Sequence, residues 1–576
     1  MMPELLHNLR DLSFPYFRSE EKFKAFTLLA AIIVLNLGMV YIQVLVNQWM
    51  REFYDVLQTL DKKAFLGEIV QFCLLAGAYI AQAVYMVYLS QMLQIRWRKW
   101  LTDRYLGSWF TRQAYYRINF TASMTDNPDQ RISEDINSYT ELTIDLGTNL
   151  LNSAATLLSF LGILWLLSGK LTINLGYKTV INIPGYMVWA ALFYSLLGTW
   201  LTMKIGNPLV LLNFNQQRFE ADFRFGMVRV RENSEAIALY GGEKQEDAHL
   251  RNHFNILMDN FWKIMRRRKR LSWLTNSYSQ AAVIFPVLMA APQFFAGEMH
   301  LGGLMQTVGA FAAVHGALSY LVTSYTTIAR WHAVIDRLGG FTRTMEMLRH
   351  VDESQQGAKR IKSSGRAMKA DSLMVSLPNG MVLVRDLDLN IAPGAHLLIT
   401  GPSGCGKSTL MRSLAGIWPF CHGAIYLPES ASIMFMPQKP YLPLGTLRTA
   451  LCYPHPNGYK PEDLENVLEK CGLGRLAASL EKNENWSQAL SLGEQQRIAF
   501  ARVLLARPDF IFLDEATASV DEKTEAGLYD LLQRELPDSA VTSIGHRGTL
   551  VAWHSEKLTF EGDAVWVKSE LGRRRN

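Results

Sequence analysis

The chain has 576 residues and a formal net charge of +6. This length excludes a single hydrophobic core and corresponds to roughly three to four units of domain size. The positive charge is modest for the length and is concentrated partly in two basic clusters, at residues 266–270 and 573–575. Because aromatic or glycine-rich RNA-binding signatures are absent, we expect the clusters to face lipid at a cytosolic membrane surface, and we expect no nucleic-acid partner.

Long apolar segments fill the first part of the chain. Residues 1–24 form an amphipathic stretch that we expect at the membrane surface. Six apolar runs follow, and each is close to the roughly 20 residues that a helix needs to cross a bilayer. The runs cover residues 25–46, 69–89, 150–167, 186–205, 281–296 and 304–322. The sequence therefore predicts a transmembrane domain with six helices over residues 25–344.

The charges of the connecting loops predict the orientation. The loops between runs two and three and between runs four and five are rich in arginine and lysine, whereas the loop between runs five and six has neither. Positively charged loops remain in the cytosol. We therefore expect both long loops and both chain ends there, and helical periodicity predicts that the membrane helices continue as long stalks. Buried helices of a large soluble protein do not explain this alternation of charge.

Four polar side chains lie within the apolar runs: Asn36, Gln82, Gln306 and His315. Polar groups are costly in a bilayer and often face a cavity, so these residues could line a translocation path. Each could equally make a hydrogen bond between two helices. The sequence leaves both alternatives open.

The composition changes after the last apolar run. Residues 345–369 are polar and predict a linker. Residues 370–576 alternate short β-rich runs with helical runs, which is typical of an α/β domain of the phosphate-loop class. The predicted fold is therefore multi-domain, with a six-helix α-helical transmembrane domain fused to an α/β P-loop ATPase domain.

The second domain contains the motif G-x-x-x-x-G-K-[ST] at residues 401–408, between a strand-like run and a helical run. This pattern is typical of a phosphate-binding loop. Glycines let the backbone curl so that N–H groups face the phosphates, and the helix N-terminus adds positive dipole. Lys407 supplies a point charge, and the Ser408 hydroxyl is a hard oxygen ligand for Mg²⁺. The predicted ATP contacts are Gly401, Pro402, Ser403, Gly404, Cys405, Gly406, Lys407, Ser408 and Thr409.

Two carboxylates follow a second apolar run, because residues 510–513 lead into Asp514 and Glu515. A strand in this place delivers both acids to the carboxyl edge of a sheet, where ligands bind in such folds. We expect Asp514 to hold Mg²⁺ through water. We expect Glu515 to polarise the water that attacks the γ-phosphate, as a general base.

Residues 490–497 read Leu-Ser-Leu-Gly-Glu-Gln-Gln-Arg and precede a helical run at 498–506. Here the sequence resembles the ATP-binding cassette (ABC) family, whose signature occupies this position. The resemblance implies that Ser491 and Gly493 approach the γ-phosphate of an ATP held by another subunit. Leu492 replaces the usual glycine and Glu494 the common glutamine, and both differences recur in the branch named below.

The other motifs of the ABC family are present, and the resemblance implies a role for each. Gln438 corresponds to the glutamine that senses Mg²⁺ and the attacking water, so the predicted metal ligands are Ser408, Gln438 and Asp514. Asp521 ends the loop that crosses the dimer interface, and His546 corresponds to the histidine that contacts the γ-phosphate. No clear aromatic residue precedes the phosphate loop, so we expect apolar contacts to the adenine.

One phosphate loop and one signature per chain cannot close two sandwiched sites. A dimer is needed, and we expect a homodimer with two-fold symmetry. Six spans argue against the soluble ABC ATPases that act on DNA or ribosomes, and Glu515 and His546 argue against a sensor that binds ATP without transport. The resemblance implies an ATPase coupled to transport, a half-transporter of the exporter-type fold.

The membrane part carries further motifs. Residues 127–135 and 233–241 look like cytosolic loop motifs of subfamily D, the peroxisomal fatty acyl-CoA transporters. Residues 215–221, 300–305, 316–321 and 335–338 are similar to the SbmA/BacA peptide uptake proteins, which lack a nucleotide domain. The whole chain resembles the bacterial YddA-like group, in which an SbmA/BacA-like membrane domain is fused to a cassette ATPase.

The two resemblances imply different substrates. The SbmA/BacA resemblance implies uptake of bulky hydrophilic solutes, such as peptides or cobalamin-like compounds, across the bacterial inner membrane, with the N-terminus and the ATPase domain in the cytosol. The subfamily D resemblance implies transport or export of lipid-like or acyl-CoA substrates. We favour the first alternative because of residues 215–221 and the motif in the sixth span.

Overall fold

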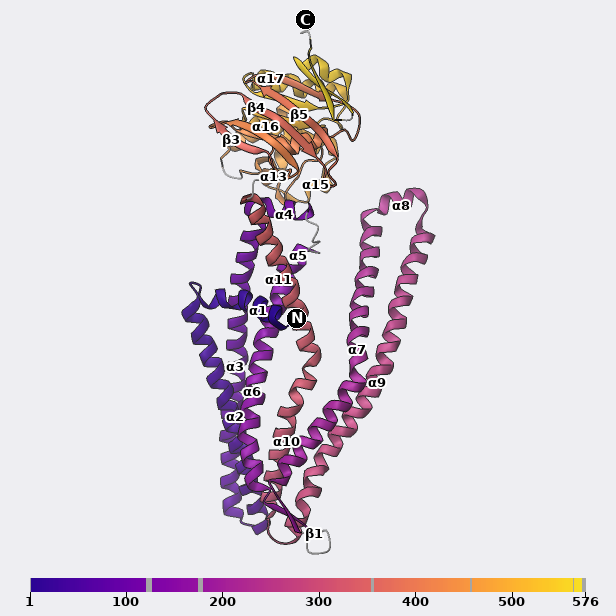
Figure 1. Cartoon of the computed structure of the whole chain (residues 1–576). Coiled ribbons are helices and arrows are strands. Elements are labelled where there is room, and N and C mark those ends of the chain that lie inside the picture. Colours follow the sequence, from indigo (N-terminus) through magenta and orange to yellow (C-terminus); the bar gives the residue numbers. More distant parts are fainter. Residues whose placement is uncertain are drawn as a thin grey trace. The chain divides into compact units, whose positions relative to one another are not determined.

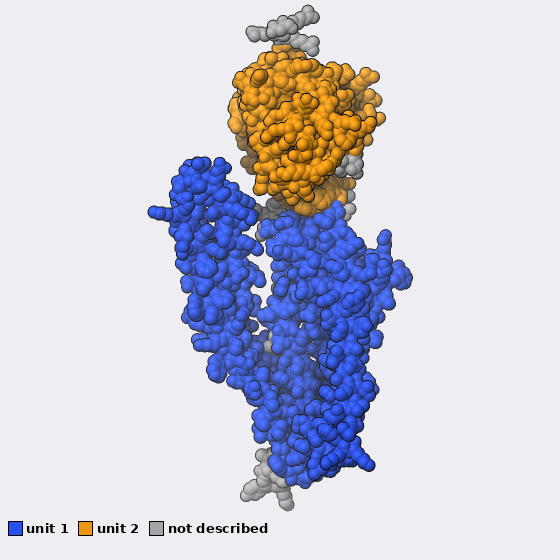
Figure 2. Space-filling model, turned by 180° about the vertical axis from the view of Figure 1, so that it is seen from behind, with its two compact units in different colours: residues 1–107, 126–342 blue, residues 108–125, 343–576 orange. Residues whose placement is uncertain are grey.

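The structure, a computed structural model, describes residues 2–120, 127–174, 180–353, 357–455, 458–562 and 564–571. It divides into two compact units, which Figure 2 shows in different colours. Unit 1 contains residues 1–107 and 126–342, and unit 2 contains residues 108–125 and 343–576. A segment between two membrane helices therefore belongs to the unit that carries the nucleotide motifs.

Unit 1 is built from long helices, and six candidate membrane spans occur in the described residues. This number agrees with the sequence prediction, and each predicted apolar run overlaps one candidate span. The principal helices are α2 (Lys22–Thr59), α3 (Lys62–Phe110), α6 (Ile136–Leu167), α7 (Tyr186–Glu232), α9 (Glu243–Phe295), α10 (Leu301–Thr323) and α11 (Tyr325–Glu353).

Three of these helices are much longer than a bilayer is thick. Helices α3, α7 and α9 have 49, 47 and 53 residues. At 1.5 Å per residue they span about 70–80 Å, against about 30 Å for the hydrocarbon core. Helix α9 continues through Pro286 and Pro292. The predicted extension of membrane helices into long stalks is therefore confirmed.

Helices α7 and α9 lie side by side and are joined by α8 (Ser234–Tyr240), as Figure 1 shows. The space-filling view shows that the end of this pair that carries α8 stands apart from the other helices of unit 1 (Figure 2). Two large apolar side chains of α8 are solvent-exposed, Leu239 at 80% and Tyr240 at 89%. The α7–α9 pair thus presents an uncovered apolar tip.

The N-terminal helix α1 (Met2–Phe17) packs against α3 and α6. Tyr16 is fully buried, and its ring stacks on Trp97 with 5.7 Å between the centroids. The Ser13 and Tyr139 hydroxyl oxygens lie 2.6 Å apart. These contacts give the predicted amphipathic segment a protein surface to pack on, in addition to the membrane surface that the sequence suggests.

Short elements connect the long helices of the first half. A β-hairpin that the sequence does not predict joins α6 to α7. The connecting elements are η1 (Thr111–Gln113), α4 (Ala114–Arg117), η2 (Ile118–Phe120), α5 (Pro128–Gln130), η3 (Arg131–Asp135), β1 (Lys170–Asn174) and β2 (Val180–Pro184).

The polar residues of the spans divide into two kinds. Asn36 Nδ2 donates to the Thr148 carbonyl at 3.1 Å, and His315 Nε2 lies 3.1 Å from the Tyr278 hydroxyl. Both make contacts between helices, one of the two alternatives from the sequence. The side-chain oxygens of Gln82 and Gln306 are buried without a hydrogen-bond partner. A buried acceptor without a hydrogen-bond partner costs free energy, because the group has lost its hydrogen bonds to water.

The core of unit 2 is a six-stranded sheet with the order β14-β13-β6-β12-β11-β8. The strands from β13 to β8 are parallel to their neighbours, and β14 is antiparallel. The apolar runs of β6, β11 and β12 make these the buried central strands of the kind that parallel sheets require. The strands are β6 (His396–Thr400), β8 (Ile433–Met436), β11 (Phe510–Asp514), β12 (Ala540–Ile544), β13 (Glu556–Gly562) and β14 (Val565–Glu570).

A second sheet of four strands has the order β3-β7-β4-β5. Both sheets contribute to one hydrophobic cluster, in which Val384, Ile399 and Phe512 are buried. The strands of the second sheet are β3 (Lys359–Ser363), β4 (Met368–Ser376), β5 (Val382–Ile391) and β7 (Cys421–Pro428).

Helices complete unit 2. The three that adjoin the nucleotide motifs are α12 (Lys407–Leu414), α16 (Leu492–Ala506) and α17 (Glu522–Glu535). The smaller elements are β9 (Gly445–Thr446), α13 (Leu447–Cys452), α14 (Pro461–Lys470), η4 (Gly474–Ser479), β10 (Asn483–Glu484), α15 (Trp486–Ala489) and η5 (Gly548–Trp553).

The stretch 345–369, predicted as a polar linker, contains the end of α11, all of β3 and the start of β4. Regular structure forms there because β3 pairs with β7 and β4 pairs with β5 and β7. The proposed domain boundaries stay a prediction.

The basic cluster at 266–270 lies in α9, whereas the cluster at 573–575 lies outside the described residues.

Candidate active site

The phosphate loop connects β6 to α12. Gly406 has a φ of 101°, in the left-handed region that favours glycine, and a Cβ there would lie 2.9 Å from the Cβ of Leu383. Helix α12 begins at Lys407, the seventh residue of the motif at 401–408. Lys407, Ser408 and Thr409 therefore occupy its first turn. Backbone N–H groups of a first turn have no partner in their own helix and can bind an anion.

Lys407 is held by the loop that it completes. Its side chain is buried, and its Nζ donates to the carbonyls of Gly401 at 2.9 Å and Pro402 at 2.7 Å. The ammonium group is thus fixed above the loop. This arrangement places one positive charge where the backbone N–H groups converge, as binding of a phosphate group requires.

The hydroxyl of Ser408 donates to Oδ1 of Asp514 at 2.9 Å. Asp514 is the last residue of β11, so the phosphate loop and the acidic strand meet at this contact. Burial raises the pKa of Asp514, the hydrogen bond from Ser408 opposes this shift, and the charge of Glu515 adds to it. Two hard oxygen atoms therefore lie together at the carboxyl edge of the sheet, and oxygen atoms are the ligands that Mg²⁺ prefers.

Glu515 links two side chains from the neighbouring strands. Gln438 Nε2 donates to Glu515 Oε2 at 2.9 Å, and His546 Nε2 lies 3.3 Å from Glu515 Oε1. Gln438 follows β8 and His546 follows β12, and both strands pair with β11 in parallel. Their carboxyl ends meet at one edge, which brings the three residues together. Glu515 has a φ of 49°, and strain of this kind clusters at active sites.

The signature residues form the start of α16. Ser491 caps the helix, and its hydroxyl accepts from Glu494 N–H. The Glu494 carboxylate accepts from Ser491 N–H at 3.0 Å and from the Ser491 hydroxyl at 2.9 Å, and it also pairs with Arg475. The glutamate therefore completes a capping box. A Cβ at Gly493 would lie 2.8 Å from the Ser519 carbonyl, so the helix approaches the following loop closely.

Asp521 caps α17 in the same manner. Its carboxylate accepts from the Thr524 N–H at 3.0 Å and the Thr524 hydroxyl at 2.7 Å, and these hydrogen bonds lower the pKa of Asp521. In the described residues the phosphate loop receives no hydrogen bond from Ser491, Gly493 or Asp521. The structure thus brings the loop, Asp514, Glu515, Gln438 and His546 together and leaves the three other predicted contacts as a separate group.

Two residues that we did not single out from the sequence connect these groups. The Gln496 side chain is fully buried, donates to the Gln438 carbonyl at 3.1 Å and accepts from Ser519 N–H at 3.0 Å. Arg547 donates to the carbonyls of Val520 at 2.8 Å and Ala518 at 3.0 Å. Gln496 lies within the signature and Arg547 directly follows His546, and these positions are the signal that could have identified them.

The segment 108–120, which the sequence places between two spans, packs on the nucleotide-binding part of unit 2. The Phe120 ring lies 5.0 Å from the Trp418 ring and 6.1 Å from the Phe420 ring, measured between centroids. Trp418 follows α12 by four residues and donates through its Nε1 to the Ser376 carbonyl at 2.9 Å. The chain between α3 and α6 is therefore tied to the helix that carries Lys407.

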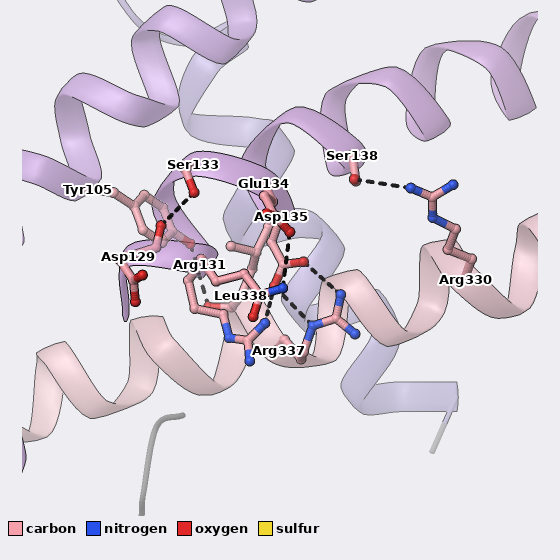
Figure 3. A network of polar contacts seen from close by, with 11 residues as sticks. Tyr105, Asp129, Arg131, Ser133, Glu134, Asp135, Ser138, Arg330, Arg337 and Leu338 are labelled. Carbon is pink, nitrogen blue, oxygen red and sulfur yellow. Dashed lines mark hydrogen bonds and ion pairs between the residues drawn. The ribbon is translucent and has the colours of Figure 1, made fainter. Parts of the chain in front are cut away.

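An ion-pair network occupies the motif at 127–135 in unit 1 (Figure 3). Asp135 is buried and accepts from Arg131 Nη1 at 2.5 Å. It also accepts from Arg337 of α11, Nε at 2.9 Å and Nη2 at 2.6 Å. On α3, the Tyr105 hydroxyl oxygen lies 2.7 Å from the Thr342 hydroxyl oxygen. These contacts join three helical segments that are distant in the sequence.

Replacing Asp135 with asparagine is expected to destabilise unit 1 more than replacing Arg337 with glutamine. The side chain of Arg131 is 10% exposed, and that of Arg337 is 41% exposed. Asp135→Asn leaves the buried Arg131 charge without its partner, which costs about 3 kcal/mol, whereas Arg337→Gln keeps the Arg131–Asp135 pair. Thermal unfolding of the two purified variants tests the order. Equal losses would show that Arg131 does not depend on Asp135.

Comparison with known proteins identifies the family. A sequence profile for the ABC transporter transmembrane region 2 matches residues 12–295, and a profile for ABC transporter matches residues 384–518. The inner membrane ABC transporter ATP-binding protein YddA of Escherichia coli is 34% identical over 92% of this chain and 93% of its own. The lysosomal cobalamin transporter ABCD4 of Homo sapiens is 28% identical over 82% of this chain and 81% of its own.

A solved structure shares the fold. A bacterial Atm1-family ABC exporter with ATP bound has a TM-score of 0.69 at 18% identity, over 93% of both chains. The six candidate spans and the nucleotide-binding unit thus follow the exporter-type architecture on a single chain. The chain belongs to the ABC transporter family, as a multi-pass half-transporter of the YddA-like group, related to subfamily D, in which an ATPase drives transport.

Proposed function

We propose that this protein forms a homodimer in the bacterial inner membrane and uses ATP to take up bulky hydrophilic solutes, such as peptides or cobalamin-like compounds. The contact of Glu515 with both Gln438 and His546 beside the phosphate loop carries the ATPase part of the proposal. The similarity of nearly the whole chain to YddA supports the inner membrane. The motifs shared with SbmA/BacA proteins and the similarity to a transporter named for cobalamin support the substrate class.

In this proposal the loop residues 401–409 bind the phosphates of ATP, and Lys407 compensates their charge. The Glu515 carboxylate orients and deprotonates the attacking water, since Gln438 and His546 fix both of its oxygens. His546 also contacts the γ-phosphate. Ser408, Asp514 and Gln438 offer oxygen atoms that fit Mg²⁺ and would hold it. The bound ion would neutralise charge on the phosphates.

The proposal of a homodimer rests on the ATP site, which the residues of one chain do not complete. Ser491, Gly493 and Asp521 make no hydrogen bond to the phosphate loop of their own chain in the described residues, so a second copy can place them on its ATP. The apolar tip with Leu239 and Tyr240 stands apart from the other helices of unit 1 and offers a surface for the second copy. A two-fold dimer closes both sites in the same way.

Ser491→Arg is expected to reduce ATP hydrolysis to background while leaving each chain folded. The larger, charged side chain blocks the approach of the signature to the partner's γ-phosphate. Phosphate release by the purified variant measures this effect, and Ser487→Arg, at an exposed serine of the preceding helix α15, is the matched control.

A mixed dimer tests whether the sites are shared. One subunit carries Ser491→Arg and the other Lys407→Ala, so that one intact loop faces one intact signature only if the sites form between subunits. We expect hydrolysis to return in the mixed dimer, although each variant alone is inactive. Continued inactivity of the mixed dimer would indicate that each chain hydrolyses ATP with its own signature.

Uptake tests the substrate class. Bacteria without their own carriers receive either the native protein or Glu515→Gln, and accumulation of a labelled proline-rich peptide and of labelled cobalamin is measured. The proposal predicts accumulation with the native protein only. No accumulation, with the purified protein still hydrolysing ATP, would favour export or the alternative substrate class.

The alternative is transport or export of lipid-like or acyl-CoA substrates. An apolar groove within the membrane part, between α2 and α3, favours it because a hydrocarbon chain fits such a lining. Stimulation of ATP hydrolysis by long-chain acyl-CoA, with no response to peptide or cobalamin, would support this alternative.

A further inference from the structure

The acid Glu525 is buried in unit 2, in the first turn of α17, and is 1% exposed. Over the parts of the chain that the structure describes, it makes no hydrogen bond or ion pair with the phosphate loop. Its Oε1 accepts from the Thr549 hydroxyl at 2.7 Å, and its Oε2 accepts from the Thr517 hydroxyl at 2.7 Å. A glutamate is almost never fully buried unless it is paired, so the partners of Glu525 define its role.

The start of α17 does not require Glu525 as a cap. Asp521 already accepts from the N–H and the hydroxyl of Thr524. Glu522 adds a second acid to the first turn, where a negative charge interacts favourably with the helix dipole. Both of these acids are exposed. The buried carboxylate of Glu525 therefore serves its side-chain partners.

The two threonines belong to the segments that carry Glu515 and His546. Thr517 follows Glu515 by two residues, in a turn in which the Ala518 N–H donates to the Glu515 carbonyl at 3.0 Å. Thr549 follows His546 by three residues. One carboxylate therefore connects the two segments whose side chains meet, because His546 Nε2 lies 3.3 Å from Glu515 Oε1.

Arg547 connects the same carboxylate to the loop that ends at Asp521. Its Nη1 lies 3.5 Å from Glu525 Oε2, and its guanidinium also donates to the Ala518 and Val520 carbonyls. The side chain of Arg547 is 34% exposed. Loss of the carboxylate charge would leave this cation without its partner and favour its movement into solvent.

We propose that Glu525 is a positioning residue for ATP hydrolysis. It connects the Glu515 turn to the His546 segment and so fixes the contact between these two side chains. The inference rests on the proposed role of Glu515 as general base. ATP itself binds to the loop between β6 and α12 in that proposal, so Glu525 controls the rate of hydrolysis and not the affinity for ATP.

Glu525→Gln tests the proposal. It keeps the volume of the side chain, replaces one acceptor oxygen by a donor amide and removes the charge that faces Arg547. We expect kcat to fall by about 10- to 100-fold, since a displacement of about 1 Å at a reacting group can cost about 10²-fold. The Kd for labelled ATP should stay unchanged. Glu522→Gln, at an exposed acid in the same turn, is the matched control and should change neither quantity.

A double variant separates positioning from a general loss of stability. In Glu515→Gln the group that Glu525 positions is already inactive, so adding Glu525→Gln should not lower the residual hydrolysis of labelled ATP further. A second fall by the same factor would show that Glu525 acts independently of Glu515 and would overturn the proposal. A native kcat in Glu525→Gln, or equal losses of kcat and ATP affinity, would also overturn it.

Thr549→Val provides a second test of the connection. It removes only the hydroxyl that links Glu525 to the His546 segment and keeps the Glu525–Arg547 pair, so it decides the matter even when Glu525→Gln does not fold. We expect a lower kcat with an unchanged Kd, and a native kcat would overturn the connection. Native-rate hydrolysis by Glu515→Gln would contradict the proposed base, whereas a slow Glu515→Gln beside a native kcat in Glu525→Gln would contradict the positioning role alone.

Discussion

Glu515→Gln is expected to lower the rate of ATP hydrolysis by roughly 10²- to 10⁴-fold while leaving ATP binding intact, as loss of a general base does. The amide keeps the size of the carboxylate and the place beside Gln438 and His546, but it cannot accept the proton of the attacking water. Phosphate release and equilibrium binding of labelled ATP, measured on the same purified protein, separate the two effects.

Glu522→Gln is the matched control for this substitution. Glu522 is an exposed acid in the first turn of α17 and, within the described residues, makes no hydrogen bond or ion pair to the phosphate loop, so its variant should hydrolyse ATP at the native rate. Hydrolysis at the native rate by Glu515→Gln would show that a different group activates the water. Loss of ATP binding in that variant would assign Glu515 to binding instead.

Lys407→Ala is expected to weaken ATP binding by roughly 10- to 100-fold, since hydrogen bonds from a charged donor contribute about 1.5–3 kcal/mol. The buried ammonium group also satisfies the Gly401 and Pro402 carbonyls, so the variant should unfold at a lower temperature than the native protein without nucleotide. Binding of labelled ATP and thermal unfolding provide the two measurements.

Lys523→Ala, which removes an exposed lysine in the first turn of α17, controls for the loss of one positive charge. It should leave both the ATP affinity and the unfolding temperature unchanged. An unchanged ATP affinity in Lys407→Ala would contradict the role of the phosphate loop. If the ATP affinity falls but the unfolding temperature does not change, only the claim that Lys407 stabilises the phosphate loop through its hydrogen bonds would be contradicted.

The sequence predicts those features that depend on local pattern. Hydropathy alone predicts the six spans, and the arginines and lysines of the loops predict the orientation of these spans. The order of parallel strands explains why Asp514 and Glu515, at the end of an apolar run, meet the phosphate loop: strands that pair in parallel bring their carboxyl ends to one edge.

Features that depend on contacts between distant residues could not be predicted in this way. Glu494 looks like a departure from the signature until the capping box with Ser491 is seen. The role of Gln496 can be seen only from its hydrogen bonds to two backbone groups, the Gln438 carbonyl and the Ser519 N–H. The packing of Phe120 on Trp418 joins positions about 300 residues apart, and no periodicity records such a contact.

The groove between α2 and α3 illustrates the same limit. Gln82 interrupts an apolar run and Asn47 directly follows one, and the sequence cannot show whether such a residue contacts a neighbouring helix or a cavity. Contacts between helices decide the matter, because Gln82 lies against Gly38 of α2 and Asn47 donates to the Gln306 carbonyl of α10.

Directional transport in proteoliposomes tests the central claim most directly. Liposomes that contain the homodimer are loaded with labelled cobalamin or peptide, and ATP is added outside, where it reaches only outward-facing ATPase domains. The outside then corresponds to the cytosol. Uptake predicts ATP-dependent loss of label from the lumen with the native protein and none with Glu515→Gln. ATP-dependent entry of label added outside would contradict uptake, and no movement in either direction during continued hydrolysis would contradict a hydrophilic substrate.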